Sequence, residues 1–192
     1  SFTFIPADLT GLYSNLKVNR WSGATWTQYT TTGASPVITI SGVNQATAPF
    51  SGSDFTGRLN PPVTYTWNQV GSANWTTAVN WTPLRSSPQT NDILVFDGSV
   101  TVAPTATNIP SQTIGKLILI SNANVNLQSA AAGQTLTISG GIGPDLNITS
   151  GSVLQLSSGG ANQIGIDFNP ATPDALIDGS LIINANGALT NS

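Results

Sequence analysis

The stretch KLILISNANVNL, residues 116–127, decides the fold because its pattern recurs twice further along the chain. The later copies are DLNITSGSVLQL from residue 145 and SLIINANGALTN from residue 180, so the copies start 29 and then 35 residues apart. Their apolar positions align in three columns, Leu117/Leu146/Leu181, Leu119/Ile148/Ile183 and Val125/Leu154/Leu189. Short strands that recur at this spacing are typical of a parallel β-solenoid, in which each coil stacks its apolar residues on the coil before it.

Two further strand candidates lie between the copies, TLTISG from residue 135 and QIGIDF from residue 163. We therefore predict coils of a right-handed parallel β-solenoid (β-helix) over residues 109–192. The third copy runs to Asn191-Ser192 without a capping segment, so we expect more coils to follow and this piece to be truncated.

The composition of the chain predicts an all-β protein. Only 7% of the residues are charged, Glu is absent, and Thr, Ser, Asn, Gly and branched aliphatic residues dominate. A hydrophobic content of 39% with a net charge of −3 excludes disorder caused by high charge and low hydrophobicity. Five scattered Lys and Arg residues cannot form the basic stripe that nucleic acid or an anionic membrane surface requires.

Several residue types are missing, and their absence bears on where the protein acts. The chain has no Cys, which suits an exported bacterial protein that needs no disulfides, and no Met, which indicates a processed or excised piece of a longer chain. No run of 18 apolar residues is present, so we predict no membrane span in this piece.

The N-terminal region predicts strands joined by tight turns. LKVNRW and TWTQYT flank a turn at Ser22-Gly23-Ala24, and VITISGV follows a break at residues 33–36. Residues 44–62 lose this periodicity and end at Pro61-Pro62, where we place a domain boundary. Three or four strands are too few for a complete sandwich, so we interpret residues 1–62 as the C-terminal part of a β-sandwich-like module.

A tryptophan-rich segment, TYTWNQVGSANWTTAVNWTPLRSSPQTNDILVFDGS at residues 64–99, lies between this boundary and the repeats. The segment resembles the W…W…NW.P…D.V.F unit that opens a β-helix in modular secreted and cell-surface proteins of Bacteroidetes-type bacteria. The matching residues are Trp67, Trp75, Asn80-Trp81-Thr82-Pro83, Pro88, Asp92 and the strand Ile93 to Phe96. By this resemblance, residues 63–108 form the opening unit of domain 63–192.

The resemblance also implies a function. Modules of this kind occur in adhesins, filament proteins and carbohydrate-active enzymes, and the chain therefore looks like a non-enzymatic structural segment at the bacterial cell surface or in the extracellular space. It would serve as an adhesin shaft or a self-associating fibre, with flanking domains of the same polypeptide, copies of itself and surface glycans as its partners. The alternative is a carbohydrate-binding module or an accessory part of a polysaccharide-active enzyme.

Trp67, Trp75 and Trp81 allow two interpretations. Large indoles can cover the apolar end of the first coil, with Asn80 and Asp92 capping backbone N–H groups in turns. Alternatively, a row of exposed indoles can stack on sugar rings while Asn80, Asn74 and Gln69 bond the hydroxyls. Glycan binding at Trp67, Trp75, Trp81 and Asn80 is the site prediction that the structure can test.

The chain contains few residue types that could act in catalysis. The chain has no His, Cys or Glu and eight Asp residues, so no Ser-His-Asp arrangement or zinc site is available. Asp92 with Asp97 and Asp174 with Asp178 are possible carboxylate pairs, and Asp92 and Asp97 are possible calcium ligands, but each lies in turn-like sequence where Asp is common. We predict no catalytic residues, no metal ligands and no cofactor.

Overall fold

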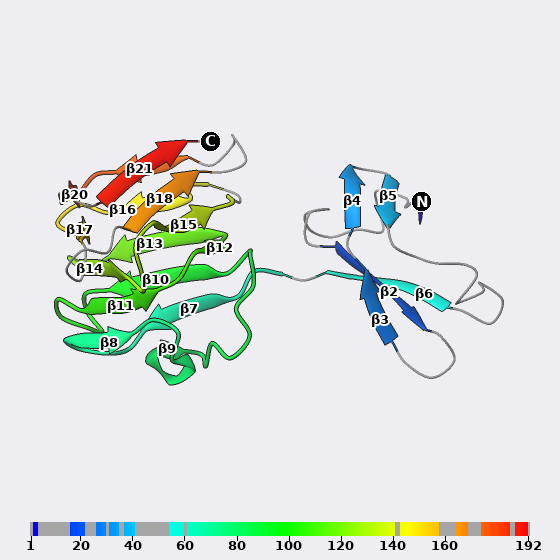
Figure 1. Ribbon diagram of the computed structural model, residues 1–192, viewed down its shortest axis with the longest axis horizontal. Coiled ribbons are helices and arrows are strands. Elements are labelled where there is room, and N and C mark those ends of the chain that lie inside the picture. Colours follow the sequence, from blue (N-terminus) through cyan, green and yellow to red (C-terminus); the bar gives the residue numbers. More distant parts are fainter. Residues whose placement is uncertain are drawn as a thin grey trace. The chain divides into compact units, whose positions relative to one another are not determined.

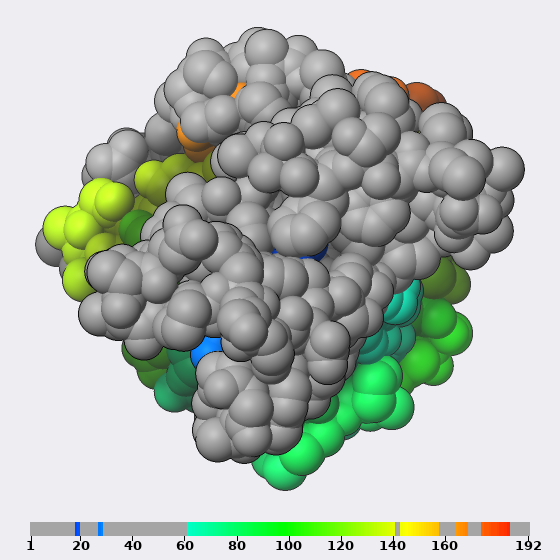
Figure 2. Space-filling model, turned by 90° about the vertical axis from the view of Figure 1, so that its right-hand side faces the viewer, coloured from blue at the N-terminus to red at the C-terminus, as the bar shows by residue number. Residues whose placement is uncertain are grey.

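The computed structural model describes residues 2–3, 16–21, 26–29, 31–34, 37–40, 54–59, 61–140, 143–157, 164–168, 174–184 and 187–191. Figure 2 shows the chain as a space-filling surface, with most of the described residues from 61 to 184 in colour. The chain divides into two compact units, Ser1–Pro61 and Pro62–Ser192. The division falls next to the boundary predicted at residue 62.

The first unit contains two small antiparallel sheets. One has the order β3 (Trp26–Tyr29), β2 (Leu16–Trp21), β6 (Asp54–Leu59), and the other has the order β1 (Phe2–Thr3), β5 (Val37–Ile40), β4 (Thr31–Ala34). The predicted hairpin is confirmed, because β2 and β3 pair from Val18 with Tyr29 to Trp21 with Trp26.

The prediction of irregular chain over residues 44–62 was wrong for β6. This strand pairs with β2 along its whole length, although a Gly and two charged residues hide its alternation in the sequence. The interpretation of residues 1–62 as part of a sandwich depends largely on residues outside the described ones, and it stays a prediction.

The second unit consists of three sheets. The first sheet contains β7 (Thr64–Trp67), β9 (Trp81–Thr82), β10 (Ile93–Asp97), β13 (Lys116–Ile120), β16 (Leu146–Ile148) and β19 (Ala175–Ile177). The second sheet contains β8 (Ser72–Asn74), β11 (Thr105–Ile109), β14 (Asn124–Ser129), β17 (Val153–Leu156) and β20 (Ser180–Ile183). The third sheet contains β12 (Gln112–Ile114), β15 (Gln134–Ile138), β18 (Ile164–Phe168) and β21 (Gly187–Asn191).

From β10 onward the chain enters the first, second and third sheets in turn, and each strand except β12, the first of the third sheet, pairs in parallel with the strand one circuit earlier. Figure 1 shows these strands rising in sequence order, from β7, β8 and β9 at one end to β20 and β21 at the other. The sole exception to parallel pairing among the described strands of this unit is β9, which runs antiparallel to β7. Apart from one short 3-10 turn at Ala78–Asn80, the described residues contain no helix, so the all-β prediction is confirmed.

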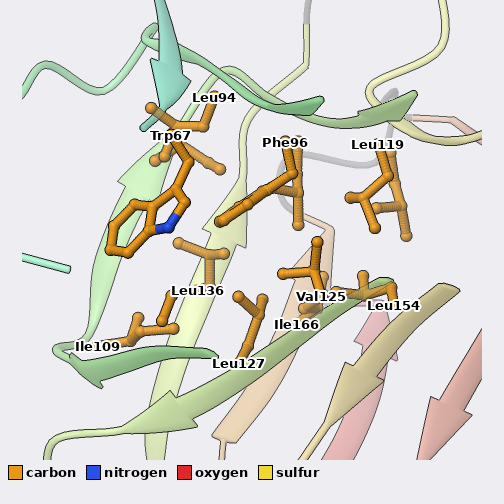
Figure 3. Packing of buried hydrophobic residues seen from close by; sticks show 14 of the residues in the cluster. Trp67, Leu94, Phe96, Ile109, Leu119, Val125, Leu127, Leu136, Leu154 and Ile166 are labelled. Atoms are coloured by element: carbon orange, nitrogen blue, oxygen red, sulfur yellow. The ribbon is translucent and has the colours of Figure 1, made fainter. Parts of the chain in front are cut away.

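Alternate residues of the strands point into a shared interior, which Figure 3 shows for ten labelled side chains. The first two sequence copies are stacked as predicted, since Leu117 pairs with Leu146, Leu119 with Ile148, and Val125 with Leu154. All six of these side chains are fully buried. Their ladder is the main core of the unit.

The alignment of the third copy was wrong. Leu181 pairs with Leu154 in the second sheet, and the strand that stacks on β16 is β19. The turn between β19 and β20 consists of Asp178 and Gly179 alone, so the apolar motif recurs one strand later than the spacing suggested. A Cβ on Gly179 would overlap the carbonyl oxygens of Ser152 and Thr149, which explains why this corner requires glycine.

Candidate functional site

The three predicted indoles meet at the end of the stack formed by β7, β8, β9 and the 3-10 turn, which we call the tryptophan end. Trp67 ends β7, Trp75 follows β8 and Trp81 starts β9, so each comes from a different segment. The ring centre of Trp81 lies 4.9 Å from that of Trp67 and 5.0 Å from that of Trp75, both in edge-to-face geometry. Phe96 of the next circuit packs beneath all three rings, at 5.7, 6.3 and 5.8 Å. Edge-to-face pairs of this kind add to the stabilisation that burial provides.

Two of the indole N–H groups bond to the chain that carries them. Trp67 Nε1 donates to the carbonyl of Gln69 at 2.8 Å, and Trp81 Nε1 donates to the carbonyl of Trp75 at 2.9 Å. Trp75 Nε1 is buried without a partner among the described residues. Hydrogen bonds to the backbone of the tryptophan end therefore fix two of the three rings.

Asn80 is the fourth predicted site residue, and it too lies at the tryptophan end. Its Nδ2 donates to the carbonyl of Asn74 at 2.7 Å, and the Thr77 N–H donates to the same carbonyl. The prediction that Asn80 caps a backbone N–H was wrong, because it binds a carbonyl instead. Asn74 and Gln69 are also engaged: Asn74 Oδ1 accepts from Thr76, and Gln69 Nε2 donates to Asn68.

The structure therefore corrects the glycan-stacking hypothesis for these residues. Trp67, Trp75 and Trp81 are 0%, 1% and 2% exposed, and Asn80 is 8% exposed. Stacking on a sugar requires an open ring face, and these faces are covered by one another and by Phe96. The alternative interpretation, that the indoles cover the end of the apolar ladder, agrees with this packing.

Residues 83–92, which we call the strap, connect β9 to β10 at a level where the described chain has no strand of the third sheet. Arg85 anchors the strap through a buried ion pair, with its Nε 2.9 Å from Asp92 Oδ2. The same carboxylate oxygen accepts the backbone N–H of Gln89 at 3.0 Å, so the predicted capping role of Asp92 is confirmed. The Arg85 guanidinium also lies 5.8 Å from the Tyr65 ring centre and 5.7 Å from that of Trp81.

This charge cluster perturbs its neighbours. Burial raises the pKa of Tyr65, the nearby Asp92 carboxylate raises it further, and the Arg85 guanidinium acts in the opposite direction. Arg85 Nη2 donates to Gln112 Oε1 at 3.3 Å. Asp92 Oδ1 and Gln112 Nε2 are buried without partners among the described residues. The cluster therefore contains polar atoms whose hydrogen-bonding capacity is not used by these contacts.

A second buried ion pair, one circuit further along, was missed from the sequence. Lys116 Nζ lies 3.3 Å from Asp145 Oδ1 and donates to the carbonyls of Gly143 and Pro144. The residues occupy the first position of the first two sequence copies, and equal positions in consecutive coils become neighbours about 4.8 Å apart. That alignment was the signal that could have revealed the pair.

The proposed carboxylate pairs are not brought together. Asp92 and Asp97 lie just before and at the end of β10, and Asp174 and Asp178 flank β19. At about 3.3 Å per residue these separations are about 16 Å and 13 Å, beyond the roughly 5–9.5 Å of glycosidase carboxylates. No group of three His, Cys, Asp or Glu residues within the described ranges could hold a metal ion.

Comparison with known proteins identifies no relative. No family model, no curated protein and no solved structure matches the chain. Among the described residues there is also no helix that is long and apolar enough to cross a membrane.

Proposed function

We propose that residues 62–192 form a right-handed parallel β-solenoid that acts as a structural, non-enzymatic shaft in a secreted or cell-surface bacterial protein. The observation that supports this proposal most directly is the order of the strands, in which each circuit from β10 onward adds one strand to each of three sheets. Such a stack extends by repetition and its stability grows with each coil, as a shaft requires. Parallel crossovers are right-handed in almost all known cases.

Two further observations support a structural role. The largest side chains of the unit are used to cover the tryptophan end, and Asp92 and Asp145 are both bound to cations of the same chain. The low charge of the chain also favours contact between copies, so self-association into a fibre is part of the proposal.

The solenoid can be tested by adding a coil. We would insert a second copy of residues 116–144 after residue 144, with a scrambled version of the same 29 residues as the control. The repeated coil should raise the slope of urea unfolding by about a fifth, because this slope follows the surface exposed on unfolding. A slope that is no higher than that of the scrambled insertion would count against stacked coils.

The shaft role is tested separately. Electron microscopy of the purified chain should show elongated or filamentous particles, and antibodies should label intact cells that make the protein. Compact monomers would contradict the fibre, and labelling that appears only after permeabilisation would contradict the surface location.

A further inference from the structure

The outer face of the second sheet carries polar side chains that belong neither to the core nor to the tryptophan end. The five strands of this sheet, β8, β11, β14, β17 and β20, contain no charged residue at all. The positions that alternate with buried residues form a column from Ser72 through Thr105 and Asn126 to Gln155, one residue on each of four strands, and the next member, on β20, is the exposed Ile182. Asn124 and Gln128 lie beside this column on β14. We call these six polar residues the amide face.

The outer face of the first sheet differs. There the corresponding positions include Ile93, Ile118 and Ile120, together with the Lys116 ion pair. The second sheet also carries apolar residues on its outer face, Val153 beside Asn124 and Ile182 beside Gln155, so its polar character is confined to the six residues of the amide face.

Most amide groups of this face have unused hydrogen-bonding capacity. The side chains of Asn124, Gln128 and Gln155 make no hydrogen bond within the described part of the chain, whereas Asn126 accepts one from Ser157. Each free amide offers two donor hydrogens and an acceptor oxygen. A partner rich in hydroxyl groups can satisfy both kinds, while an anionic or cationic polymer finds no opposite charge here.

The dimensions of the face restrict its partner. The four strands that carry the face lie about 4.8 Å apart and span about 14 Å, and strands of this length extend about 10–20 Å, so the face covers about 200 Å². A stable contact with another protein takes about 800 Å² per partner. The amide face is thus too small for a protein partner on its own but long enough for an extended, narrow chain.

We propose that the amide face binds a neutral polysaccharide, which lies across the strands and along the column of Ser72, Thr105, Asn126 and Gln155. Binding would use hydrogen bonds to sugar hydroxyls and no ring stacking. Each contact is weak, and the four members of the column add their contacts to the same polymer. This site is distinct from the buried indoles, and it does not depend on whether the unit is a shaft.

The experiment is co-sedimentation of the complete chain with insoluble neutral polysaccharides, cellulose, chitin and curdlan, and with calcium alginate gel as an anionic one. We expect retention on at least one neutral polymer and none on alginate. In the double variant Asn124→Ala/Gln155→Ala, binding to that polymer should weaken about tenfold, equivalent to about 1.4 kcal/mol of lost hydrogen bonding.

The matched control is Thr113→Ala/Thr137→Ala, on paired positions that alternate with the buried residues of the third sheet. This control should retain full binding, and far-UV circular dichroism should show both variants folded. Equal loss in both variants, retention by the amide-face variant, or no retention on any neutral polymer would overturn the proposal. Concentration-dependent dimerisation that the amide-face variant abolishes would also overturn it, because the occupant would then be a second copy of the chain.

Discussion

The two ends of the three-sheet stack differ in how their inner columns are covered. At the tryptophan end, β9 pairs with β7, and the Asn80 side chain donates a hydrogen bond to the carbonyl of Asn74, the last residue of β8. The indoles at this end are fully buried. At the opposite end, formed by β19 and β20 and called the far end, Ile177 and Ile183 continue the inner columns but are 41% and 44% exposed.

The comparison shows that an inward-pointing apolar side chain stabilises the fold only when a further layer of strands or side chains covers it. Leu156 and Ile183 are adjacent members of one column, yet Leu156 is fully buried and Ile183 is not. The indoles supply at one end the covering layer that neighbouring strands of the three sheets supply in the middle. Substitutions at the two ends should therefore have very different effects on stability.

The largest effect is expected from Trp81→Ala, because Trp81 contacts both other indoles and Phe96. Removing a buried indole should lower the free energy of unfolding by about 3–5 kcal/mol in urea titration. Val79→Ala is the matched control from the adjacent turn, since Val79 is 62% exposed, and it should change stability by less than about 0.5 kcal/mol. Similar effects of the two variants would contradict a covering role for the indole.

The next effect concerns the strap. Arg85→Met leaves the Asp92 carboxylate buried and unpaired, so we expect a loss of about 3 kcal/mol by urea unfolding. The double variant Arg85→Met/Asp92→Leu removes both charges and should be more stable than either single variant. A double variant whose loss equals the sum of the two single losses would show that the pair does not couple.

A smaller effect is expected at the far end. Ile183→Ala should cost about 1 kcal/mol or less because the side chain is 44% exposed, whereas Leu156→Ala directly beside it should cost about 2–5 kcal/mol. Hydrogen exchange should likewise be faster for β20 than for β14. Equal costs for the two variants would mean that the far end is covered in solution.

The smallest effect is a pH dependence at the corner after β10. Hydrogen bonds from the hydroxyl and the backbone N–H of Ser99 hold the pKa of Asp97 below its ordinary value of 3.8. A lowered folded pKa gives stability that is present above the unfolded pKa and is lost as the pH falls through the folded value. Asp97→Asn should therefore reduce the loss of Tm between about pH 5 and pH 2. Ser99→Ala is the second variant, and a pKa of Asp97 that stays low in it, measured by NMR titration, would contradict this cause.

The sequence predicted how strands stack wherever an apolar pattern repeats in neighbouring strands of one sheet. Alternation and spacing placed Leu117 over Leu146 and Val125 over Leu154, because paired parallel strands must align their apolar faces. The same reasoning misplaced Leu181, since a two-residue turn shortens the last circuit and an apolar pattern does not record turn length. The strand β6 was missed for a related reason, as its pairing with β2 depends on distant residues.

The sequence predicted which residues come together at the candidate site, but it did not predict whether their side chains are buried or exposed. The sequence brought Trp67, Trp75, Trp81 and Asn80 to one place, but the parity of their spacing could not tell buried rings from exposed ones. Three separate segments carry the indoles, so burial depends on how those segments fold back. The Lys116 ion pair was missed because the stacking of strands makes its residues neighbours, and the Arg85 ion pair was missed because it depends on how the strap folds back on itself.

The antiparallel return of β9 has a consequence for how the chain is made. A ribosome releases β7, β8, β9 and the indoles before any later circuit, and N-terminal segments fold first during synthesis. Once this end has formed, each later strand except β12, which starts the third sheet, finds a completed edge to pair with. The order of residues along the polypeptide is therefore also an order of assembly, with the tryptophan end as its template.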